Sequence, residues 1–288
     1  MVWRAVLMVL CCSSLSAQER WVYRYNGPGN YDDQAFSIAV GPDSSLFVAG
    51  FSWAGPAGYD FTVVSLTPSG AERWMYTYNG PANDWDEARS IVMGIDGNVY
   101  AAGYSIGSGT SGDLTVVSLT PSGGERWVYR YNGSANNWDW AYSIAVGADS
   151  NLYAAGYSIE NGTSADFTIV SLTPSGGERW VYRYNGPGNY DDAANSVVMG
   201  AGGNLYVAGF SLGSGTSYDF TVVSLTPSGG ERWVYRYNGP GNYDDGANAV
   251  AMGADSNLYA AGYSLGSGTS HDFTVVSLTP SGGERWIY

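Results

Sequence analysis

The chain repeats one pattern of apolar and polar positions from beginning to end. The tripeptide Glu-Arg-Trp recurs at a constant interval of 53 residues, the separation of Trp21 and Trp74. This interval divides the chain into the repeats 21–73, 74–126, 127–179, 180–232 and 233–285, with the start of a sixth at 286–288. Repeats of this length normally bury their apolar faces against their neighbours. We therefore predict a single repeat domain over residues 18–288.

Each repeat contains four short segments that alternate or run apolar, as strands do. Around the repeat 180–232 they lie at 178–185 (ERWVYRYN), which begins two residues before it, 195–199 (NSVVM), 205–211 (LYVAGFS) and 219–226 (DFTVVSLT). The short turns at 200–204 and 227–230 predict two antiparallel hairpins. Four antiparallel strands per repeat are typical of a β-propeller blade. We predict an all-β, five-bladed propeller, with NSVVM innermost and ERWVYRYN outermost; a parallel β-solenoid is the alternative fold.

The repeat also resembles a known family. Residues 172–211 (LTPSGGERWVYRYNGPGNYDDAANSVVMGAGGNLYVAGFS) resemble the bacterial SBBP-type β-propeller repeat in the Gly turn, the Trp-containing strand, the Asp-Asp loop and the Tyr-Val-Ala-Gly strand. The resemblance covers the mature chain. It implies an exported or surface-located bacterial protein, and such repeats commonly sit in longer chains. It implies no particular activity.

The N-terminal residues 1–17 have the pattern of a signal peptide. Arg4 provides the positive charge of the n-region, and residues 5–12 form the apolar h-region. Residues 13–17 form the cleavage region, which is rich in small residues. We expect a secreted or cell-surface protein; Cys11 leaves a lipoprotein signal as an alternative. The remaining chain has no cysteine and no further stretch long and apolar enough to span a membrane.

Both ends of the chain contain a copy of the outermost strand, at 19–26 and 284–288. Either the N-terminal copy completes the last blade, or the sequence is a fragment of a longer propeller, truncated after Tyr288. The sequence leaves both open, and with them the oligomeric state.

Net charge and amino-acid composition limit the functions that we expect for this chain. The chain has 26 acidic residues against 12 basic ones and a net charge of −14, which excludes nucleic acid as an expected partner and suits a polysaccharide or a protein. After the signal peptide there is no Cys, no Lys and one histidine, His271, so we predict no enzyme and no cofactor. The expected function is a non-catalytic binding or structural module. The alternative is a glycoside hydrolase that uses acids outside the repeat, Glu87 and Glu160.

Repeat-to-repeat differences concentrate in two connections of each blade, from outermost to innermost strand and from second to third strand. In a propeller both connections reach the same face, which we call the variable face. We predict that ligand specificity resides there. The candidate binding aromatics are Trp53, Trp85, Trp138, Trp140, Tyr190 and Tyr243. Gap-filling between blades is the alternative role.

Two acidic positions recur in every blade on this face. We predict that they tie their own loops by accepting backbone N–H bonds, with calcium ligation as the alternative. The first set is Asp33, Asp86, Asp139, Asp192 and Asp245; the second is Asp60, Asp113, Asp166, Asp219 and Asp272.

Overall fold

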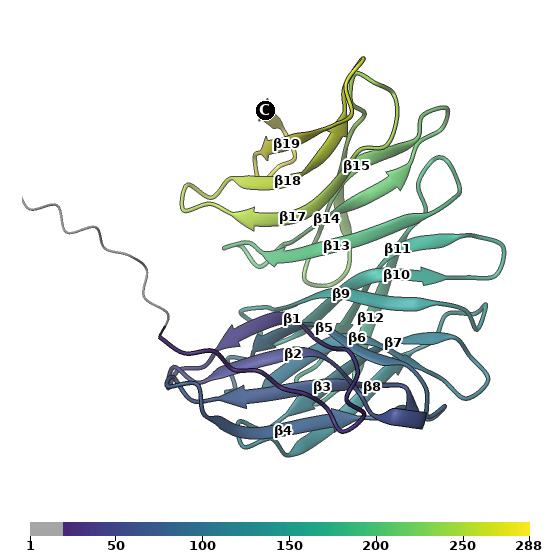
Figure 1. Ribbon diagram of the computed structural model, residues 1–288. Coiled ribbons are helices and arrows are strands. Elements are labelled where there is room, and N and C mark those ends of the chain that lie inside the picture. Colours follow the sequence, from purple (N-terminus) through teal and green to yellow (C-terminus); the bar gives the residue numbers. More distant parts are fainter. Residues whose placement is uncertain (1–19) are drawn as a thin grey trace, which may run out of the picture.

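The computed structural model describes residues 20–288 and consists of five four-stranded antiparallel sheets (Figure 1). The predicted signal peptide, 1–17, lies outside the described residues. Blades 1 and 2 comprise β1 (Asp33–Val40), β2 (Leu46–Trp53), β3 (Tyr59–Leu66), β4 (Glu72–Tyr78), β5 (Asp86–Met93), β6 (Val99–Ile106), β7 (Gly112–Leu119) and β8 (Glu125–Tyr131). Blades 3 and 4 comprise β9 (Asp139–Val146), β10 (Leu152–Ile159), β11 (Ala165–Leu172), β12 (Glu178–Tyr184), β13 (Asp192–Met199), β14 (Leu205–Leu212), β15 (Tyr218–Leu225) and β16 (Glu231–Tyr237). Blade 5 comprises β17 (Gly246–Met252), β18 (Leu258–Leu265), β19 (His271–Leu278) and β20 (Glu284–Ile287).

Strand order within every blade follows the chain, so the predicted propeller blade is confirmed. The hairpin turns between third and fourth strands form because the sequence places glycine where the turn requires a positive φ angle. In the turn between β3 and β4, Gly70 has φ +84° and its N–H bonds to the carbonyl of Thr67. A residue with a side chain is strained at such an angle. The turn therefore recurs as Pro-Ser-Gly in every blade.

The apolar faces of successive blades pack together, and this builds one core between each neighbouring pair. Between blades 1 and 2, Phe47, Phe61 and Val63 of the first meet Ile91 and Leu119 of the second. The same positions form the cores between the next three pairs of blades. Four cores thus hold five blades in a fixed succession.

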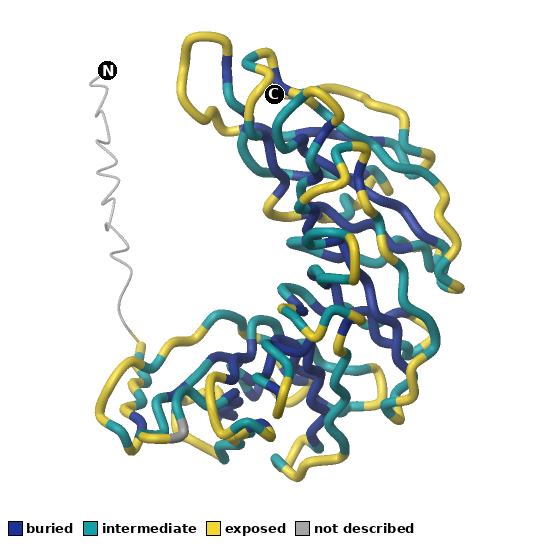
Figure 2. Tube along the Cα trace, turned by 90° about the vertical axis from the view of Figure 1, so that its right-hand side faces the viewer, coloured by how far each residue is buried: buried dark blue, intermediate teal, exposed yellow. Residues whose placement is uncertain are grey.

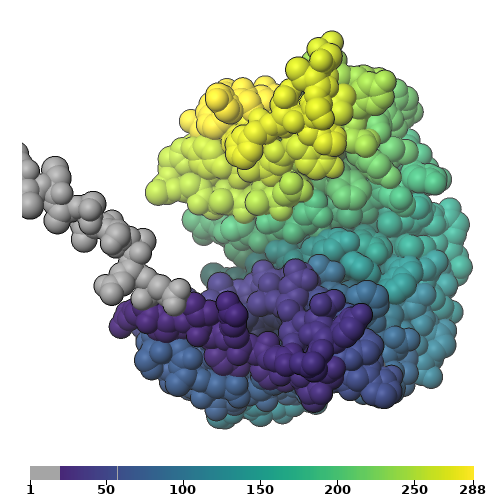
Figure 3. Space-filling view, viewed as in Figure 1, coloured from purple at the N-terminus to yellow at the C-terminus, as the bar shows by residue number. Residues whose placement is uncertain are grey.

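The blades form an arc that is open between the first and the last (Figures 2 and 3). The innermost strands β1, β5, β9, β13 and β17 lie against one another in that order, so they line the concave side. No helix among residues 20–288 has the length and apolar character that crossing a membrane requires.

Each innermost strand carries a β-bulge at the same place. In blade 2 the pairing jumps from Ala88 to Ser90, which leaves Arg89 as the extra residue opposite β6. Gly103 lies opposite this bulge, and a Cβ there would come within 1.8 Å of the carbonyl oxygen of Glu87. A bulge bends the strand and redirects one side chain. The close approach requires glycine at this position.

Candidate binding site

The two predicted acidic positions lie at the same edge of the blade. In blade 1, Ser52 of β2 pairs with Asp33 on one side and with Asp60 on the other. The loop from the preceding outermost strand and the loop between second and third strands therefore meet on one face. This is the variable face.

The first acidic set joins these two loops. Asp86 accepts the N–H of Gly80 at 2.6 Å through Oδ2 and that of Ile106 at 3.1 Å through Oδ1. The equivalent pairs of bonds recur at Asp33, Asp139, Asp192 and Asp245. Because amide donors point at both oxygens, the carboxylates hold the loops rather than present themselves to a cation. The loops thereby become a fixed platform.

The second acidic set depends on an arginine from the outermost strand. Arg130 and Arg236 form ion pairs of 2.7 Å with Asp113 and Asp219, respectively. Asp60 has no such arginine, since residue 77 is Thr, and burial raises its pKa. Asp272, in the last blade, is exposed and accepts a bond from Thr269.

Blade 3 departs from this arrangement because of Glu160. Arg183 pairs with Glu160 at 2.7 Å, and Tyr131 donates to the same carboxylate at 2.9 Å. Asp166, which is buried, keeps only the hydroxyl of Thr163 as a hydrogen-bond donor. Burial raises the pKa of Asp166 to about 6, and the nearby charges of Asp192 and Glu160 add to this.

Two of the predicted aromatics come together in a groove between blades 1 and 2. Trp53, at the end of β2, packs edge-on against Tyr59 with ring centres 4.9 Å apart, and Tyr59 lies 5.1 Å from Trp85. The short 3-10 helix η1 (Gly55–Ala57) replaces the Gly-Ser-Gly-Thr-Ser type of loop found in other blades. Gly55 and Pro56 of this helix form one wall of a hollow of about 640 Å³, which Asn83 and Asp84 complete. We call this hollow the aromatic groove.

The aromatic groove combines apolar rings with hydrogen-bonding groups. Trp85 remains 44% exposed, so part of its ring is free for a ligand. Asn83 and Asp84 offer an amide and a carboxylate beside the rings. A flat apolar surface flanked by such groups can bind a sugar ring, whose C–H face stacks while its hydroxyls are hydrogen-bonded.

Trp138 and Trp140 belong to a second cluster, between blades 2 and 3. Trp140 is stacked on Tyr104 at 4.2 Å with planes only 5° apart, and Arg89 lies over its ring at 5.6 Å. Much of the Trp140 ring is thus already in contact with protein. Trp138 is 37% exposed and lies on Gly112, a position that holds Tyr, Ala, Tyr and His in the other repeats.

The remaining predicted aromatics, Tyr190 and Tyr243, are exposed on corresponding loops of blades 4 and 5. They lie away from the aromatic groove, whose lining comes from blades 1 and 2. Their binding role stays a prediction.

Sequence reasoning missed the bulged residues of the innermost strands. Their flanking residues are nearly constant between repeats, whereas the bulged positions differ: Phe36, Arg89, Tyr142, Asn195 and Asn248. Arg89 lies over the ring of Phe36 at 4.3 Å and pairs with the buried Glu87 at 2.5 Å. The signal was present as variation inside a strand, but only the structure shows that these residues form bulges.

Comparison with protein-family profiles and with curated protein sequences gives no match. Among solved structures, a protein of unknown function from Bacteroides caccae is similar with a TM-score of 0.54 and 15% identity, over 88% of this chain and 81% of that one. A suggested gluconolactonase has a TM-score of 0.44 and 13% identity, over 88% of this chain and 76% of that one. At this identity the first likeness concerns the fold alone.

Proposed function

We propose that this chain is an exported, non-catalytic binding module that takes a neutral polysaccharide in the aromatic groove. The observation that carries the proposal is the grouping of Trp53, Tyr59 and Trp85 around a hollow that also contains Asn83 and Asp84. Because the chain carries a net charge of −14, a neutral polymer suits it better than a polyanion. The signal-peptide pattern and the resemblance to SBBP repeats support an exported location.

The hydrolase alternative has weaker support in the geometry. Its two candidate acids lie on different blades, and each is paired with an arginine: Glu87 with Arg89 and Glu160 with Arg183. A glycosidase needs two carboxylates that flank one bond of the substrate. Neither acid lines the aromatic groove.

A glycan array followed by calorimetry tests the proposal. We expect Trp85→Ala to weaken binding of the selected neutral glycan at least about tenfold, roughly 1.4 kcal/mol. The matched control is Ile95→Ala, which removes another exposed apolar side chain, in the hairpin turn at the opposite edge of blade 2. Equal losses in both variants, or no glycan bound at all, contradict the proposal. Release of sugars from a bound polysaccharide favours the hydrolase, and capture of a protein ligand at the same residues favours a protein-binding module.

A further inference from the structure

The N-terminal segment, residues 20–26, occupies the place of an outermost strand on blade 1. The indole N–H of Trp21 donates to the carbonyl of Pro68 at 3.2 Å, and the hydroxyl of Tyr23 donates to Glu72 at 2.6 Å. The outermost strand of each of blades 1–4 makes the same two bonds to the blade that follows it. The segment therefore lies as if it completed a blade before blade 1.

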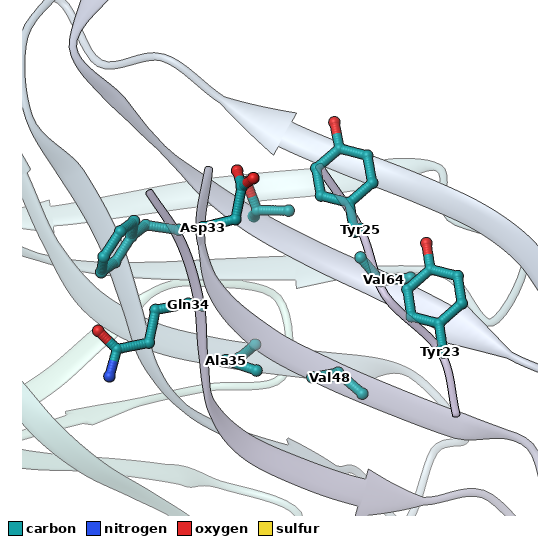
Figure 4. A pocket seen from close by; sticks show the side chains of 11 residues that line it. Tyr23, Tyr25, Asp33, Gln34, Ala35, Val48 and Val64 are labelled. Atoms are coloured by element: carbon teal, nitrogen blue, oxygen red, sulfur yellow. The ribbon is translucent and has the colours of Figure 1, made fainter. Parts of the chain in front are cut away.

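Among residues 20–288, no strands take the place of the three inner strands of that blade beside the segment. In their place is a hollow of about 180 Å³ between Tyr23 and Tyr25 on one side and Ala35, Val48 and Val64 on the other (Figure 4). In the core between blades 1 and 2, the positions of these last three residues are filled by Ala88, Ala101 and Val117, which are buried. Ala35, Val48 and Val64 therefore lie at positions that contact the preceding blade elsewhere in the protein.

Blade 5 presents the complementary surface at the other end of the arc. Phe273 is 73% exposed, whereas Phe61, Phe167 and Phe220, at the same repeat position, are fully buried. Trp286 and Tyr288 are also exposed. The outer face of blade 5 thus exposes the kind of apolar side chain that the other blades bury against a neighbouring blade.

We propose that blade 5 docks on blade 1 of a second copy of this chain, with residues 20–26 of that copy replacing 284–288 as the outermost strand. The replacement extends the pairing with β19. By the register of the other blades, Tyr25 would cover Phe273 as Tyr78 covers Phe61, and Arg24 would pair with Asp272 as Arg236 pairs with Asp219. Of the residues in these two contacts, Arg24, Asp272 and Phe273 are exposed in the single chain and Tyr25 is half-buried.

A second copy fits these faces better than closure of the same chain on itself. The first and last blades are separated by an open gap (Figures 2 and 3), and four close-packed cores fix the angle between successive blades. Closing the gap within one chain would require all four to repack, which dense interiors resist. Docking of a second copy leaves them unchanged. The contact is heterologous, so it produces rings or open chains of copies.

Light scattering after size exclusion, over a range of concentrations, tests this proposal. We expect masses at multiples of the monomer. Phe273→Ser should give monomers without loss of folding, since this side chain is exposed in the single chain. The control Tyr190→Ser removes an exposed aromatic away from both end faces and should leave association unchanged. A monomer at all concentrations overturns the proposal, as does association that survives Phe273→Ser.

Charge reversal tests the expected pair between copies. Arg24→Asp and Asp272→Arg should each weaken association at least about tenfold, because each places like charges opposite one another. An equimolar mixture of the two variants should associate as the unaltered protein does, since copies of the two variants can alternate so that every contact joins opposite charges. A mixture restores only contacts between copies, whereas a contact within one chain would need both changes in the same molecule. A mixture that stays monomeric therefore overturns the proposal.

Discussion

Arg183 pairs with Glu160 instead of with Asp166, and replacing Glu160 should allow Arg183 to pair with Asp166. At the same position blades 2, 4 and 5 have glycine, at residues 107, 213 and 266. In two of these blades the arginine of the outermost strand reaches the buried Asp at 2.7 Å. We predict that in Glu160→Gly the guanidinium of Arg183 turns to Asp166.

The magnitude follows from the pKa of Asp166. Burial holds this pKa at about 6, against an ordinary value of 3.8. At 1.36 kcal/mol per pKa unit, keeping the buried carboxylate charged at neutral pH costs roughly 3 kcal/mol. The variant loses the Glu160–Arg183 pair, about 1 kcal/mol or less, and also the hydrogen bonds that Tyr131, Ser134 and Ser158 donate to Glu160, about 1 kcal/mol each. These losses offset the gain at neutral pH, so we predict a change in the pH dependence: the stability lost between pH 4 and pH 7 should be smaller in the variant by up to roughly 3 kcal/mol.

The raised pKa of Asp166 also makes the free energy of unfolding depend on pH. Because the folded pKa of Asp166 lies above the unfolded value, its contribution to stability is full below about pH 4 and is lost as the pH rises through about 6. Burial also raises the pKa of Asp86 and Asp139 to about 6, so these two add the same slope. Their share is common to all variants, and the difference between Glu160→Gly and the control Glu160→Gln, both of which lack the carboxyl of Glu160, isolates Asp166.

Carboxyl NMR titration and urea unfolding from pH 4 to 7 measure both effects. The pKa of Asp166 should fall to about 4 in Glu160→Gly, the value of an ordinary aspartate. Glu160→Gln is the control, since it removes the charge but keeps a side chain in the space beside Arg183. If the pKa of Asp166 stays near 6 in the glycine variant, the competition between the two carboxylates is not its cause.

Two further predictions concern the concave side and the second aromatic cluster. Gly103→Ala should destabilise the protein by about 3 kcal/mol or more, because its Cβ meets the carbonyl of Glu87; Gly202→Ala, whose Cβ has no atom nearer than 3.6 Å, should be nearly neutral in the same thermal denaturation. Trp140→Ala should cost about 2–3 kcal/mol by removing the stack with Tyr104, yet leave glycan affinity unchanged; a large loss of affinity at full stability would place the ligand at this second cluster instead.

The blade plan was predictable because it depends on short-range pattern. Alternation over seven or eight residues and Gly at the turns fix strand pairing locally, and the same solution recurs in every repeat. The sharing of one edge by Asp33 and Asp60 follows from that pairing. The bulges were missed because one extra residue in a strand leaves no distinct mark in an alternating pattern.

The candidate site was predictable only as a set of residues on one face. Trp53 and Trp85 belong to different blades, and their grouping depends on how blade 2 packs on blade 1. In the sequence, Trp140 was a candidate binding residue like Trp53 and Trp85. Its stack on Tyr104 arises from the packing of blade 3 on blade 2, which no single repeat specifies.

The sequence by itself determined the repeat, the four strands of each blade, their order and the face that varies, since all of these depend on neighbours in the chain. The tertiary structure decided which aromatics share a groove, which carboxylate Arg183 pairs with and that the arc of blades stays open at Phe273. Those outcomes depend on the angle at which one sheet packs on the next. That angle is set by the side chains of two blades together and is not encoded in either alone.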